Sequence, residues 1–103
     1  MSYAIGGLFS LFKNEIPFRI ELAVASVMGV VLIFLPFPLF NKGIMGASLV
    51  LVLMCEAFNS AVEQAVDIAS PELSGKAKKA KDYAAAGVLF SIIINGLIWG
   101  VSL

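Results

Sequence analysis

Three long apolar stretches dominate the sequence. We expect membrane-spanning helices over residues 20–40, 43–69 and 83–103, because about 20 mostly apolar residues are needed to cross the hydrocarbon core of a bilayer. Apolar residues make up 60% of the chain and charged residues only 14%, whereas about a quarter of the residues in a soluble domain are charged. The sequence therefore predicts an all-α integral membrane protein with a single domain.

The first nineteen residues have a different pattern. Ile5, Leu8, Phe9 and Phe12 recur at the spacing of one helix face, with basic residues following them. We expect an amphipathic helix over 1–19 that lies in the membrane interface; a frayed tail is the alternative. No cleavable signal peptide is evident, so we expect the spans themselves to direct insertion.

The cations are distributed unequally about the expected spans. Lys42 falls on one side of the membrane, and six cations fall on the other: Lys13, Arg19, Lys76, Lys78, Lys79 and Lys81. This asymmetry predicts that the N-terminus and the lysine-rich segment 70–82, a polar loop or the start of a helix, face the cytoplasm. The formal net charge is zero, which argues against a nucleic-acid partner. The absence of histidine excludes histidine-based catalysis and histidine metal ligands.

The middle span carries polar residues on one face. With about 100° of rotation per residue, Glu56, Asn59, Glu63 and Asp67 fall within about 80° of arc. We call these four residues the polar stripe. They begin inside the membrane and end near the cytoplasmic interface, so this face is the predicted functional site.

Carboxylates at this depth need compensation, because a charged side chain inside the bilayer costs on the order of a few kcal/mol. Mg²⁺ prefers oxygen ligands and commonly uses one or two carboxylates together with substrate phosphates. Glu15, just before the first span, is expected at the same depth and completes such a site. The lysines of the loop then face the anionic oxygens of a phosphorylated ligand. Two alternatives are interhelical hydrogen bonding and a small membrane transporter subunit, although the acids gather at one interface and not at the midplane.

Three runs carry a resemblance to a known family. They are Asn14-Glu15 with Phe18-Arg19 and Glu21, the run from Glu56 to Glu63 with Asp67, and Ala80-Lys81-Asp82 with Ala84-Ala85-Ala86. In residue type and spacing the chain resembles the prokaryotic diacylglycerol kinases, which are small lipid kinases with three spans. The likeness covers nearly the whole chain.

The resemblance implies a role for each matching residue. Glu56 matches the general base that takes the proton of the lipid hydroxyl, with Asn59 in support. Glu15 and Glu63 match the ligands of the Mg²⁺ that accompanies ATP, and Lys81 and Asp82 match the nucleotide contacts. It further implies a homotrimer with shared active sites, acting on diacylglycerol or, as some members do, on undecaprenol. The role of Asp67 stays open.

The chain also departs from the family pattern in two places. It begins late relative to longer members, and its loop lacks the histidine that often precedes the Lys-Asp pair. We expect these differences to affect adenine recognition more than phosphoryl transfer.

Overall fold

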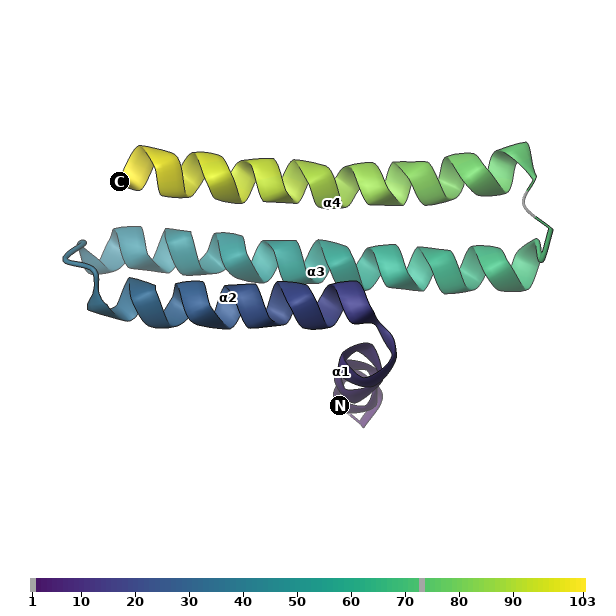
Figure 1. The fold of residues 1–103 in the computed structure, drawn as a ribbon, viewed down its shortest axis with the longest axis horizontal. Coiled ribbons are helices and arrows are strands. Elements are labelled where there is room, and N and C mark those ends of the chain that lie inside the picture. The colour runs from purple at the N-terminus through teal and green to yellow at the C-terminus, as the bar shows by residue number, and fades with distance from the viewer. Residues whose placement is uncertain (1, 73) are drawn as a thin grey trace.

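The computed structural model describes residues 2–72 and 74–103, which form four α-helices. Their bounds are α1 Ser2–Asn14, α2 Ile16–Phe34, α3 Leu39–Ala69 and α4 Gly75–Ser102. Helices α2, α3 and α4 lie side by side with α3 in the middle, and α1 leaves the line of the bundle at the start of α2 (Figure 1). Each of the three long helices is long and apolar enough to cross a membrane. The expected all-helical fold is thus confirmed, with three helices that could span a membrane.

Short sequence signals set the ends of the helices. Pro17 lies in the first turn of α2, where its missing N–H costs nothing. Leu35, before Pro36, is extended and ends α2, since the residue before a proline avoids the helical region. At the next turn Lys42 Nζ donates to the Ile33 carbonyl at 2.9 Å. Ser74 caps α4, its hydroxyl accepting from the Ala77 N–H at 3.1 Å.

Helices α3 and α4 are longer than the expected spans, since they start at Leu39 and Gly75, four and eight residues before the starts expected at 43 and 83. Helix α2 is instead shifted toward the N-terminus, from the expected 20–40 to Ile16–Phe34. The lysine-rich segment, expected as a polar loop or the start of a helix, is therefore largely the first two turns of α4. The Ser74 cap and the alanines at 77 and 80 explain this, because alanine is the strongest helix former and lysine is also favourable.

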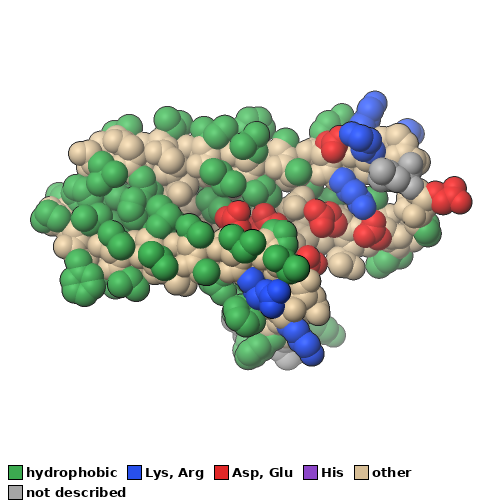
Figure 2. Space-filling view, viewed as in Figure 1, with side chains coloured by type: hydrophobic (Ala, Val, Ile, Leu, Met, Phe, Trp, Pro, Cys, Tyr) green, Lys and Arg blue, Asp and Glu red, His purple; other side chains and the backbone are tan. Residues whose placement is uncertain are grey.

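Charge and apolar surface separate along the bundle. Charged side chains gather where α2 begins, α3 ends and α4 begins, and green apolar side chains cover the rest of the face in view (Figure 2). We call the charged end the polar end. Large apolar side chains point outward along all three long helices, among them Val27, Val50, Phe58, Phe90 and Leu97. Lipid covers such a surface in a membrane protein.

A polar network joins α3 to α4 away from the polar end. The buried Ser48 hydroxyl lies 2.7 Å from Asn95 Oδ1 and 2.6 Å from the Met45 carbonyl, and Trp99 Nε1 donates to that carbonyl at 3.3 Å. Polar side chains of this kind bond helices together in an apolar environment. The network fixes the register of α4 against α3, and with it the place where Lys81 meets the polar stripe.

We expect Ser48→Ala to destabilise the bundle more than Ser91→Ala does. Both serines are buried and both bond a carbonyl of their own helix at 2.6 Å, but only Ser48 also reaches another helix. The additional loss is about 0.6 kcal/mol, the typical strength of a cross-helix hydrogen bond in a membrane protein. Unfolding of the two variants in mixed micelles measures the difference. Equal losses would mean that the network does not hold α4 in register.

Candidate functional site

The polar stripe lies on α3 as the sequence predicts, and its members become more exposed toward the polar end. Glu56 is 5% exposed, Asn59 and Glu63 are half-buried, and Asp67 is exposed. Ser60, one turn after Glu56, is also buried. A regular helix with spacings of three, four and four residues produces this shared face.

Glu56 lies among other carboxylates. Glu15, at the junction of α1 and α2, Glu21 in α2, and Glu63 in α3 are all close enough to interact electrostatically with it. The ion pairs found in the described chain, Lys78–Asp82 and Lys81–Asp67, involve none of these four acids. Only Glu56 of the four is buried, and a buried charge without a paired cation is unfavourable. The cluster is therefore suited to a cationic ligand.

The Asn59 side chain connects the buried and exposed parts of the stripe. Its Nδ2 donates to Glu63 Oε1 at 3.1 Å, while its buried Oδ1 has no hydrogen-bond partner in the described part of the chain. An unpaired buried acceptor is rare in folded proteins. The carboxylate oxygens of Glu63 and this amide oxygen are all hard oxygen donors, the kind that Mg²⁺ prefers.

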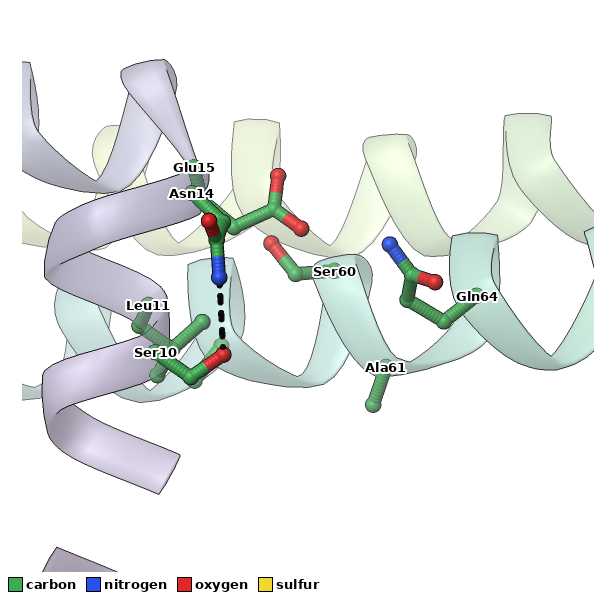
Figure 3. Close-up of a pocket in the computed structure, with 8 residues that line it drawn as sticks. Ser10, Leu11, Asn14, Glu15, Ser60, Ala61 and Gln64 are labelled. Atoms are coloured by element: carbon green, nitrogen blue, oxygen red, sulfur yellow. Dashed lines mark hydrogen bonds between the residues drawn. The ribbon is translucent and has the colours of Figure 1, made fainter. Parts of the chain in front are cut away.

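Glu15 faces a cavity of about 530 Å³ between α1 and α3. Glu15 precedes the first turn of α2, but its side chain makes no capping hydrogen bond. Instead its carboxylate is directed toward the α3 side of the cavity, near Ser60 (Figure 3). The other lining residues are Ser10, Leu11, Asn14, Ala57, Ala61 and Gln64.

The two carboxylates expected to share a metal thus occupy different surroundings. Glu15 lines the cavity beneath α1, whereas Glu63, bonded to Asn59, is not part of that lining. The described residues contain no cluster of three or more acidic or cysteine side chains arranged to hold a metal. The described residues of one chain therefore offer only a few oxygen ligands to a metal ion. This suits Mg²⁺, which usually takes one or two carboxylates from the protein and fills its other positions with water and substrate oxygens.

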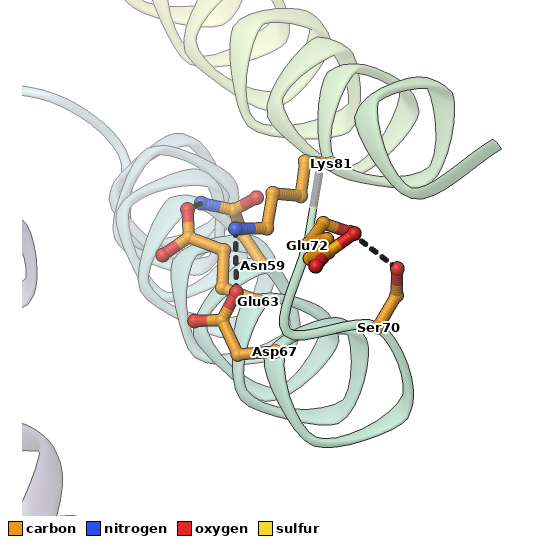
Figure 4. Close-up of polar contacts among 6 residues, drawn as sticks. All are labelled: Asn59, Glu63, Asp67, Ser70, Glu72 and Lys81. Carbon is orange, nitrogen blue, oxygen red and sulfur yellow. Dashed lines mark hydrogen bonds and ion pairs between the residues drawn. The ribbon is translucent and has the colours of Figure 1, made fainter. Parts of the chain in front are cut away.

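The two residues of α4 that we expect to contact the nucleotide point in different directions. Lys81 Nζ reaches across to Asp67 Oδ1 on α3 at 2.6 Å (Figure 4). Asp82, the next residue, pairs with Lys78 of its own helix at 2.7 Å, and both of those side chains are exposed. Consecutive helical residues differ by about 100° in direction, so only Lys81 joins the polar stripe within this chain.

Sequence reasoning did not place Glu21 in the site. The side chain is half-buried and lines a cavity of about 230 Å³ between α2, α3 and α4. The sequence did contain a signal for it, because Glu21 is the sole charged residue in the first expected span. An ionisable residue within a span indicates a functional site by default.

Comparison with known proteins identifies the family. The family model for prokaryotic diacylglycerol kinase matches residues 2–103. The chain belongs to this family. Diacylglycerol kinase of Haemophilus influenzae is 37% identical over 98 residues, covering 95% of this chain and 83% of its own length. Diacylglycerol kinases of Sinorhizobium sp. and Escherichia coli K12 are 34% and 31% identical, covering 93% and 98% of this chain and 69% and 83% of their own lengths.

The resemblance drawn from the three sequence runs is thereby confirmed, as is the expected enzyme class, a lipid kinase. The acidic face of α3 is the natural candidate for its active site. It combines a buried carboxylate, oxygen donors suited to a metal, and a lysine at its exposed end.

Proposed function

We propose that the protein transfers the γ-phosphoryl group of ATP to the hydroxyl of diacylglycerol, giving phosphatidic acid. The observation that carries this proposal is the order of groups along α3: buried Glu56, then Asn59 and Glu63, then Asp67, which holds Lys81 of α4 at the exposed end. This order matches the two substrates: the lipid hydroxyl is proposed to bind at the buried end of the stripe and the nucleotide at the polar end. The names of the relatives support the choice of lipid.

In this mechanism Glu56 acts as the general base. Its carboxylate takes the proton of the lipid hydroxyl while that oxygen bonds to the γ-phosphorus and the bond to the β-phosphate oxygen breaks, releasing ADP. Glu56 is proposed to lie at the depth of the lipid hydroxyl, and its burial keeps most bulk water away from it. Asn59 supports the site by holding Glu63 through the 3.1 Å hydrogen bond.

Glu63 and Glu15 are the proposed Mg²⁺ ligands, and the unpaired Oδ1 of Asn59 fits the same hard ion. When bound, Mg²⁺ neutralises charge on the transferring phosphates. Lys81 contributes a second positive charge from α4. Asp82 is the proposed contact to the rest of the nucleotide, and its exposed position leaves it accessible from the polar end.

The lipid is proposed to enter sideways from the bilayer. The cavity between α2, α3 and α4 is lined mainly by apolar side chains, and one of these, Val52, lies one turn before Glu56 on α3. An acyl chain lying along this cavity brings its headgroup toward Glu56. Glu21, in the same cavity wall, borders the path of the headgroup.

The proposed setting is the bacterial inner membrane, with the polar end in the cytoplasm, where ATP is available. Exposed apolar side chains of α1, including Leu8, Phe9 and Phe12, support an amphipathic helix that lies in the interface. We further propose a homotrimer. Packing between copies shields the stripe from lipid and brings additional groups, including Glu15 of a second copy, to each site.

We expect purified protein in mixed micelles to phosphorylate diacylglycerol faster than undecaprenol at equal mole fractions. The test supplies ATP labelled in its γ-phosphate, offers both lipids side by side and separates the products by chromatography. Preferential labelling of undecaprenol would instead make the protein an undecaprenol kinase. Labelling of neither lipid would reject the proposed phosphoryl transfer.

A further inference from the structure

The ion pair between Lys81 and Asp67 joins two helices at the exposed end of the polar stripe. The two residues are 14 positions apart in sequence, and their charged atoms are 2.6 Å apart. The other ion pair of the described residues, Lys78–Asp82, lies within α4. Lys81–Asp67 is thus the one ion pair in the described chain that connects α4 to the stripe.

The two partners of this pair are unequally exposed. The Lys81 side chain is 33% exposed, compared with 61% for Asp67 and 65% for Lys78. Lys81 lies four residues after buried Ala77 and seven before buried Val88, the spacing of one helix face. Its stem therefore runs over α3, and Asp67 determines where its ammonium group ends.

Local hydrogen bonds order the short connection between the two helices at this end. Ser70 Oγ donates to the Glu72 carbonyl at 2.5 Å, and Ser74 caps α4. Farther along, the network of Ser48, Asn95 and Trp99 fixes the register of the helices. An exposed ion pair adds little to stability, so the pair is not needed to hold α4 against α3.

We propose that Asp67 is a positioning residue for nucleotide binding: it holds the ammonium of Lys81 beside Glu63, where the phosphates of ATP arrive. Asp67 lies one helical turn beyond Glu63, and both side chains share the face that Lys81 crosses (Figure 4). This inference rests on the proposed function. It assigns a role to the one member of the polar stripe whose role the sequence leaves open.

Asp67 affects an incoming polyphosphate in two opposite ways. It orders Lys81, a flexible side chain that otherwise loses much rotamer freedom on binding, and its own negative charge repels the phosphates. The carboxylate is mostly exposed to solvent, so water and salt screen this repulsion. Lys81 is the more buried partner, and its ordering is the larger effect.

We expect Asp67→Asn to raise the KM for ATP-Mg about fivefold, with kcat changed less than about twofold and the KM for diacylglycerol unchanged. Asp67→Glu restores part of the loss, since it keeps the carboxylate. In a Lys81→Met background, Asp67→Asn has no further effect, because Asp67 acts through Lys81. Initial rates at varied ATP-Mg and varied lipid provide all of these values.

Lys79→Met is the matched control for Lys81→Met, because it removes the same charge from an exposed position of α4. We expect it to change the KM for ATP-Mg less than about twofold. An unchanged or lower KM in Asp67→Asn would overturn the positioning role. So would an undiminished effect of Asp67→Asn in the Lys81→Met background, or an equal effect of Lys79→Met.

Failure of the proposed function appears separately in the same assay. If wild-type protein labels no lipid from ATP, the kinase proposal fails whatever the variants do. If the wild type is active and Lys81→Met keeps the wild-type KM for ATP-Mg, Lys81 does not contact the nucleotide and the role of Asp67 is overturned with it.

Discussion

Replacing Glu56 with glutamine is expected to lower kcat by about a thousandfold, within the usual contribution of a general base. Glutamine has almost the same shape but cannot take the proton of the lipid hydroxyl. Binding of ATP-Mg is expected to change less than about twofold, because the phosphates are proposed to lie at the other end of the stripe. Rates of labelled phosphate transfer and equilibrium binding of the nucleotide, measured on one preparation, separate the two effects.

Glu56→Asp is the companion variant. It keeps a carboxylate but withdraws it by one methylene, so we expect partial activity between that of the wild type and that of Glu56→Gln. Near-normal turnover in Glu56→Gln would remove Glu56 as the base. Loss of nucleotide binding in proportion to turnover would instead place it in the ATP site.

Replacing Glu63 with glutamine is expected to raise the Mg²⁺ concentration needed for half-maximal activity about tenfold. Glutamine can still accept the hydrogen bond from Asn59 Nδ2, but it lacks the negative charge that attracts the ion. The rate measured against free Mg²⁺, at a fixed saturating lipid concentration, gives this value.

Glu72→Gln is the matched control for the metal prediction. It makes the same substitution at an exposed carboxylate of the polar end that has no part in the proposed site. We expect its Mg²⁺ dependence to stay at the wild-type value. A Glu63→Gln variant with the same Mg²⁺ dependence as the wild type would exclude Glu63 from the metal ligands.

Much of the fold follows from local sequence signals. Long apolar stretches predict spanning helices because lipid leaves backbone groups no other partners, and Pro36 and Pro38 mark the turn between the first two. The last expected span was located by apolar content, which left open whether the lysine-rich segment before it is a loop or the start of the helix. The helix begins eight residues earlier, at a serine cap followed by lysines and alanines, where capping and propensity decide.

The stripe itself was predictable because it depends only on the geometry of one regular helix. The surroundings of the stripe depend on how helices pack, which spacing along one helix does not specify. The approach of Glu21 to Glu56 and the reach of Lys81 to Asp67 belong to this second kind. The different directions of Lys81 and Asp82 could have been predicted, since neighbouring residues on a helix do not share a face.

The central claim is that the acidic face of α3 performs ATP-dependent phosphorylation of a lipid. Its most direct test is the transfer of labelled γ-phosphate to diacylglycerol by purified wild-type protein and by Glu56→Gln in parallel. We predict one labelled lipid with the mobility of phosphatidic acid in the wild-type reaction and almost none in the variant. Labelled inorganic phosphate without labelled lipid, or equal amounts of labelled lipid in both reactions, would contradict the claim.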